Sequence, residues 1–471
     1  AKYGELAREG ISCTVCHHIN PPNPEKVLKW KPKKGWLPRT DNPTQRELAY
    51  MLFYNTTGQY EPGPADELNG PFKDVREMPM EDVLGITPTY NEYVKDSKLC
   101  GSCHTINLPN IGQSFDKNNI LNDSEQNPAF KGYNHTIEQA TFVEWQNSAF
   151  GEFAEPGEFQ SCQECHMPGG FQNLDGTIDI PQITTKIATI QDNTYPEVEN
   201  EASREEIEVP HRTDYRRHEH VGLNVFLLEM FNQFPDVLGV DEKDQMTYAT
   251  TGNTLAIENM VRQARNSTID LDFEVASFQK NNLKVEVAVK NKTGHRFPSG
   301  VSFRRAFIEF LVMEGDKVIW GSGRTNSVGV ILNDKGQPLK TEFLDVKAPD
   351  GVLYQPHYQE INSQDQVQIY EELNQNSFKE FTTSFIHRDH SIKDNRLLPK
   401  GWKPSSYFKS QGEVIRQFMA ATDPHGVGSD SDYVGVDSPE VFAGQDKLLY
   451  NIQLPKGVDR SKLAIKVTMY Y

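Results

Sequence analysis

The pattern of apolar and polar residues changes near residue 268 of this 471-residue chain. After that position, residues 283–290 (LKVEVAVK) alternate strictly between apolar and polar side chains. Such alternation predicts a β-strand, because successive side chains of a strand point to opposite faces of its sheet. Further apolar runs bounded by turn residues predict more strands, at 305–313, 317–323, 366–373, 379–387, 447–454 and 463–471.

The first half of the chain instead contains short segments with helical spacing, separated by loops rich in proline and glycine. Residues 43–55 begin with a proline, which is favoured in the first turn of a helix. In residues 136–150, Phe142 and Trp145 fall on one apolar face of a predicted helix. Helical spacing returns in residues 210–234 and 251–266.

These two patterns predict an α+β chain of two domains. We expect residues 1–267 to form a loop-rich, mainly helical domain, and residues 268–471 to form an antiparallel β-sandwich. The sequence contains no run of eighteen apolar residues, so it predicts no transmembrane segment.

The net charge of the chain indicates which classes of macromolecule it is expected to bind. The chain has 66 acidic and 48 basic residues, which give a formal net charge of −18. This charge argues against nucleic acid as a partner, since binding of nucleic acid depends on basic side chains at the phosphates. It favours docking of a basic partner and opposes docking of an acidic one.

The cysteines carry the most specific chemical signal in the sequence. All six lie in the pattern C-x-x-C-H, which is the attachment signature of c-type haem. Two thiols add to the vinyl groups of the porphyrin, and the histidine that follows binds the iron. The sequence therefore predicts three covalently bound haem c groups, with these cysteines and proximal histidines: Cys13, Cys16 and His17; Cys100, Cys103 and His104; Cys162, Cys165 and His166.

Other roles explain this pattern less well. A zinc site needs four ligands that close a tetrahedron, and it does not require a histidine after every cysteine pair. A thioredoxin-like dithiol is expected once in a chain, whereas the pattern here occurs three times. A disulfide framework is typical of small secreted domains, and 471 residues can bury a core without one. We therefore interpret residues 1–267 as a trihaem cytochrome c domain and residues 268–471 as haem-free.

The predicted cofactor also indicates a compartment. Covalent haem attachment takes place outside the cytoplasm in bacteria and archaea, so we expect a periplasmic or extracellular protein. The chain begins at Ala1, and we interpret it as a mature chain whose signal peptide has been removed.

Each haem also needs a ligand on its second face. His211, His218 and His220 lie within ten residues of one another after the last attachment motif, so at least one of them is expected to bind iron. His218 and His220 alternate along the chain, so one can bind iron while the other orients a haem propionate.

Further candidates lie elsewhere in the chain. His295 lies in the turn 291–300 (NKTGHRFPSG), between glycines and beside a proline, where a single imidazole can be held outward from a sheet. His18 directly follows a proximal histidine, and it is either a ligand of a neighbouring haem or an exposed polar residue. Met78 and Met80 are the alternatives among the methionines, and methionine ligation would raise the reduction potential. The other histidines are expected to be ordinary surface or supporting residues.

Several motifs together resemble a family of secreted multihaem c-type cytochromes that have a haem-free β-sandwich at the C-terminus. In chain order they are NHTIEQATFVEWQNSAF, SCQECHMP, HEHVGLN, TGHRFPSG and KDNRLLP, and they span nearly the whole sequence. The resemblance implies that His218 and His295 face the haems. Relatives tend to have an aromatic residue where this chain has His220, which leaves the choice between His218 and His220 open.

These features favour extracytoplasmic electron transfer between redox protein partners, with no catalytic residues of the chain's own. Histidines are numerous enough to fill every sixth position, which argues against an enzyme. One alternative is a multihaem oxidoreductase in which one haem keeps an open position for a small nitrogen or sulfur compound. The other is an electron-transfer subunit of a larger redox complex or filament, an oligomer assembled through edge strands of the β domain.

Overall fold

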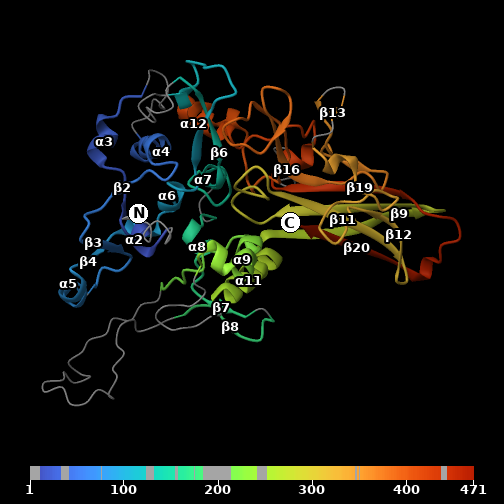
Figure 1. Ribbon diagram of the computed structural model, residues 1–471, viewed down its shortest axis with the longest axis horizontal. Helices are drawn as coiled ribbons and strands as arrows, with labels where there is room; N and C mark the ends of the chain where they lie inside the picture. The colour runs from blue at the N-terminus through green and yellow to red at the C-terminus, as the bar shows by residue number, and fades with distance from the viewer. Residues whose placement is uncertain are drawn as a thin grey trace, which may run out of the picture. The chain divides into compact units, whose positions relative to one another are not determined.

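The computed structural model divides the chain into two compact units, each assembled from segments that are far apart in the sequence (Figure 1). The first unit comprises Ala1–Asn20, Pro62–Leu99 and Gln160–Ser267, and the second comprises Pro21–Glu61, Cys100–Phe159 and Thr268–Tyr471. The structure describes residues 11–32, 42–75, 77–122, 132–153, 158–173, 175–183, 214–240, 252–344, 347–348, 351–435 and 443–471.

The first unit consists of short helices joined by loops. Two of its small sheets are two-stranded: β3 (Glu67–Gly70) pairs parallel with β4 (Thr87–Tyr90), and β7 (Phe171–Gln172) pairs antiparallel with β8 (Asp179–Ile180). Its helices are α2 (Cys13–His17), α5 (Met78–Leu84), α8 (Cys162–His166), α9 (Val225–Gln233), α10 (Pro235–Leu238) and α11 (Gly252–Gln263). Helix α6 (Ser97–Gly101) crosses from this unit into the second.

The second unit contains the large sheets. A four-stranded sheet has the order β15-β19-β10-β9, and a six-stranded sheet has the path β12-β11-β16-β17, with β18 paired to β16 and β20 paired to β11. The strands are β9 (Ile269–Gln279), β10 (Asn282–Asn291), β11 (Arg305–Glu314), β12 (Lys317–Ser322), β15 (Glu360–Ile361), β16 (Ile369–Gln375), β17 (Phe381–Thr382), β18 (His390–Asp394), β19 (Gln445–Gln453) and β20 (Leu463–Tyr470).

The core of these sheets follows from the alternation in the sequence. Val285, Val287 and Val289 of β10 are fully buried, whereas the residues between them are partly exposed. Phe310 of β11 stacks on Tyr450 of β19 with ring centroids 4.1 Å apart, so side chains from both sheets share one core. The predicted combination of helices and antiparallel sheets is therefore confirmed, and the division into a cytochrome domain and a sandwich domain stays a prediction.

Earlier segments of the chain complete the second unit. They include α3 (Pro24–Lys29), α4 (Pro43–Tyr54), the antiparallel pair β5 (Ile106–Asn110) and β6 (Asn134–Gln139), and α7 (Thr141–Gln146). Later in the chain, α12 (Glu413–Ala420) and α13 (Ser431–Val434) belong to the same unit, and Phe53 of α4 packs edge-on against Phe418 of α12.

Two predicted helices are shorter than expected. The helix predicted over 136–150 is limited to α7, because residues 134–139 pair with β5 as a strand. In the segment 210–234, the helix begins only at Val225, and residues 214–224 are not helical. His220 has a φ of +45°, which a helix does not permit. Among the described residues, no helix is long and apolar enough to cross a membrane.

Candidate haem sites

Each of the first and third attachment motifs folds as one short helix. In α2 and α8, the two cysteines lie three positions apart, so their side chains share one helix face. Helix α8 begins with a capping box, in which Ser161 and Glu164 bind each other's backbone amide. The six cysteines form no disulfide bond in the structure, which leaves their sulfur atoms available for thioether bonds.

The second motif is anchored by backbone contacts within its own unit. Thr57 N donates to Thr105 O at 2.7 Å, and Gly58 N donates to Ser102 O at 2.8 Å. Phe142 N of α7 donates to His104 O at 3.1 Å, while the side chain of His104 is exposed. The backbone of this motif is therefore fixed from two sides.

Two of the predicted iron ligands, His17 and His166, share one hydrogen-bond arrangement. Nδ1 of His17 contacts Asn69 O at 2.5 Å, and Nδ1 of His166 contacts Val221 O at 2.6 Å. A carbonyl oxygen can only accept, so Nδ1 must carry the hydrogen, and Nε2 of the neutral ring keeps its lone pair. This is how metal-bound histidines are usually held, and the contact fixes the ring orientation and raises the basicity of Nε2.

Two candidates for the second axial position are held in the same way. Nδ1 of His18 donates to Thr14 O at 2.7 Å, and Nδ1 of His295 donates to Arg296 O at 3.0 Å. Nε2 of His18 is buried and makes no hydrogen bond within the described residues. A buried ring nitrogen that lacks a partner is costly, and iron would satisfy it. The exposed-residue alternative for His18 therefore fits the geometry less well.

The rings of His17 and His218 lie close together. Their centroids are 6.2 Å apart, with an angle of 33° between the planes. Metal–nitrogen bonds of about 2 Å on each side of one ion, with the two rings, account for roughly this separation. His220 lies beside His218 at 5.8 Å, with its ring nearly perpendicular. The geometry thus distinguishes His218, which pairs with a proximal histidine, from its neighbour.

The local environment also favours neutral imidazoles. Desolvation lowers the pKa of His218 below its ordinary value, with smaller contributions from His220 and His17. Desolvation likewise lowers the pKa of His220. Since only the neutral ring can bind a metal, both shifts favour the ligating form.

The nearby arginines are paired with acidic side chains of the protein. Arg216 lies 3.8 Å from Glu164 of α8. Arg217 forms an ion pair with Glu219, and Arg262 of α11 lies 3.5 Å from the same carboxylate. These ion pairs hold the segment that carries His218 and His220. Because the three arginines are paired with carboxylates, the segment does not offer an open basic pocket for a substrate.

The remaining predictions have different outcomes in the structure. His211 lies outside the described residues. Met78 is 69 % exposed, at the start of α5. The carbonyl groups of Asn69 and Val221 were missed by sequence reasoning, because backbone acceptors leave no signal in the residue pattern.

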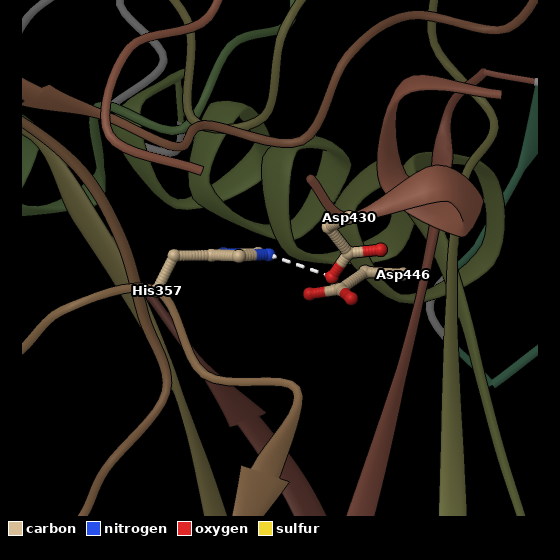
Figure 2. Close-up of side chains that lie close together, drawn as sticks. All are labelled: His357, Asp430 and Asp446. Atoms are coloured by element: carbon tan, nitrogen blue, oxygen red, sulfur yellow. Dashed lines mark hydrogen bonds and ion pairs between the residues drawn. The ribbon is translucent and has the colours of Figure 1, made fainter. Parts of the chain in front are cut away.

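A different cluster offers metal-ligand atoms but does not suit a metal. The ligand atoms of His357, Asp430 and Asp446 lie within 4.8 Å of one another, and Figure 2 shows the imidazole and both carboxylates converging. However, Nδ1 of His357 contacts the amide nitrogens of Gln368 at 2.9 Å and Asn395 at 3.2 Å.

Both amide orientations are fixed, which decides the tautomer of His357. Gln368 Oε1 accepts from Tyr358 N, and Asn395 Oδ1 accepts from Glu371 N, so the amide nitrogens must face the imidazole. Nδ1 of His357 therefore accepts, and Nε2 carries the hydrogen that it donates to Asp430 at 3.2 Å. This arrangement is the reverse of the one found at the predicted iron ligands, and it leaves no lone pair for a metal.

Comparison with known proteins does not identify a family for this chain. No protein-family model and no curated protein matches the chain. Among solved structures, the chain is similar to a penta-heme cytochrome c552 from Thermochromatium tepidum, with 14 % sequence identity and a TM-score of 0.31. The match covers 70 % of this chain and 59 % of the cytochrome, so the chain spans less than two thirds of that protein. A similarity of this size assigns no family.

Proposed function

We propose that this chain is an extracytoplasmic electron-transfer protein that holds three c-type haems. The cysteine pairs would attach the porphyrins, and His17, His104 and His166 would be the proximal ligands. The observation that carries the proposal is the arrangement shared by His17 and His166, in which a backbone carbonyl accepts from Nδ1 and Nε2 of the neutral ring keeps its lone pair.

Histidines would also fill the opposite axial positions. His218 would be the partner of His17, because the centroids of their rings lie 6.2 Å apart. His18 and His295 are the candidates for the other irons, since Nδ1 of each donates to a backbone carbonyl. His220 and His211 are the alternative ligands if one of these assignments is wrong.

When bound, each haem supplies a one-electron Fe(III)/Fe(II) couple. The contribution of the chain is to hold two neutral imidazoles toward each iron. A carbonyl that accepts from Nδ1 makes the imidazole more basic, which favours the oxidised metal and lowers the reduction potential. Filling both axial positions also keeps small substrates away from the iron, so the arrangement suits electron transfer better than catalysis.

Partners and location follow from the same proposal. Covalent haem attachment takes place outside the cytoplasm in bacteria and archaea, so we propose a periplasmic or extracellular location. The net charge of −18 would attract a redox partner with a basic docking surface, and would make association weaker at high salt.

The proposal predicts a haem at every C-x-x-C-H motif. Purified protein should contain three haems per chain in the pyridine haemochrome assay, and mass spectrometry of its proteolytic peptides should find one haem on each motif. Replacement of Cys162 and Cys165 by alanine should remove the haem from that peptide alone and leave the other two. Peptides that carry zinc or no group in the secreted protein would contradict the proposal.

A further inference from the structure

The turn that carries His295 is held rigidly by its own residues. Asn291 is buried, and its Nδ2 donates to the carbonyls of His295 at 2.8 Å and Leu398 at 3.0 Å. Its Oδ1 accepts from the amide and the hydroxyl of Thr293 at 2.9 and 2.8 Å. These bonds fix the backbone at Thr293 and at the carbonyl of His295. The direction of the His295 imidazole therefore depends on the contacts that hold the turn in place.

A buried carboxylate from another element holds this turn. Glu144 of α7 is 0 % exposed, and its Oε2 accepts from Arg296 N at 3.1 Å and from Ser299 Oγ at 2.8 Å. The first bond fastens the peptide directly after His295. The negative charge of Glu144 is compensated by the guanidinium of Arg296, which lies 3.9 Å from Glu144 Oε1.

Arg296 is itself fixed on its far side. It is 1 % exposed, and it forms an ion pair with Asp394 of β18 at 2.7 Å. It also donates to Asp423 O at 2.9 Å. A buried charge that loses its partner is strongly destabilising, so Glu144 and Asp394 together hold Arg296 in one position.

Helix α7 also contacts the second attachment motif. A Cβ added at Gly101 would lie 2.7 Å from the ring of Phe142, and one added at Gly294 would lie 2.9 Å from the ring of Trp145. Both glycines are therefore required for close approach to this helix. The motif of Cys100, Cys103 and His104 and the turn of His295 thus pack on the same short helix.

We propose that Glu144 is a positioning residue that aims the imidazole of His295 at an iron held by this chain. This inference rests on the proposed function, in which His295 is an axial ligand. Helix α7 would make that ligand and the second attachment motif one rigid group, so that the distance between imidazole and haem is set by packing rather than by a loop.

The test is a comparison of variants by the visible spectrum of the reduced protein, with and without carbon monoxide. Glu144→Ala should allow about one haem in three to bind carbon monoxide, as His295→Ala does, because the unfastened turn no longer holds the sixth ligand. Glu144→Gln should behave as the wild type, since its amide oxygen can accept from both Arg296 N and Ser299 Oγ.

The matched control is Glu138→Ala in β6. Glu138 is also a buried glutamate, 4 % exposed, but it accepts from Ser302 N rather than from the turn of His295. We expect this variant to exclude carbon monoxide. If Glu144→Ala does not fold, Glu144→Asp takes its place, because it keeps the charge and shortens the side chain by one methylene.

The outcomes separate this inference from the proposed function. Carbon monoxide excluded from folded Glu144→Ala or Glu144→Asp, with three haems still attached, would overturn the role of Glu144 and leave the proposed function intact. Carbon monoxide binding in His295→Ala together with exclusion in the Glu144 variants would have the same meaning. A chain without covalent haem would overturn the proposed function itself.

Discussion

Replacement of His218 by alanine should make about one third of the haem in the reduced protein able to bind carbon monoxide. The ring centroids of His218 and His17 lie 6.2 Å apart, so in the proposed arrangement the loss of His218 opens one axial position. The oxidised variant should show one high-spin haem by electron paramagnetic resonance, and the haem count should stay at three. His218→Met should restore the low-spin state and raise the potential of that haem, because a thioether is a weaker donor to Fe(III).

The neighbouring histidine provides the matched control. His220 lies in the same segment, 5.8 Å from His218, and both rings are partly desolvated. We expect that His220→Ala, like the wild type, does not bind carbon monoxide. If His220→Ala opens an iron and His218→Ala does not, the assignment of the two histidines must be exchanged.

Replacement of Asp446 by asparagine should stabilise the folded protein at neutral pH. Burial raises the pKa of Asp446 from 3.8 to about 6 in the folded chain. Folding therefore favours the protonated form, so the contribution of this group to the free energy of unfolding is fully present only below about pH 4 and is lost as the pH rises through about 6. The difference corresponds to about 3 kcal/mol, from the raised pKa.

The oxygen of an asparagine amide can take the place of Asp446 Oδ2, and its nitrogen that of Oδ1, which is buried and makes no hydrogen bond within the described residues. Asp446 Oδ2 accepts from Tyr370 OH at 2.7 Å and from Gln368 Nε2 at 3.0 Å, and an amide oxygen can accept both bonds. Thermal unfolding between pH 4 and 7 should show the melting temperature of Asp446→Asn rising relative to the wild type. Asp334→Asn, at an exposed position, should run parallel to the wild type. Parallel curves for both variants would show that Asp446 ionises without cost.

The sequence was most informative where the pattern is local. The alternation in 283–290 predicted β10, because period-two burial is a property of the strand itself. It failed at residues 134–139, where helical spacing in the sequence is overridden by pairing with β5. The two units could not be predicted either, since segments such as 21–61 and 100–159 join the large sheets only through long-range packing.

In the candidate sites, too, local patterns could be predicted from the sequence and long-range contacts could not. The C-x-x-C-H motifs predict the attachment positions directly, because covalent haem attachment requires that spacing. The choice between His218 and His220 needed the ring geometry, which no spacing provides. Glu144 had no signal at all, because its partners Arg296 and Ser299 lie more than a hundred residues away in the sequence.

The most direct test is the visible spectrum of the reduced wild-type protein with and without carbon monoxide. We predict no change on addition of carbon monoxide, because in the proposed arrangement two imidazoles close every iron and the chain carries electrons rather than binding a substrate. A shift that accounts for about one haem in three would contradict this prediction, and would make an oxidoreductase with one open iron the better explanation.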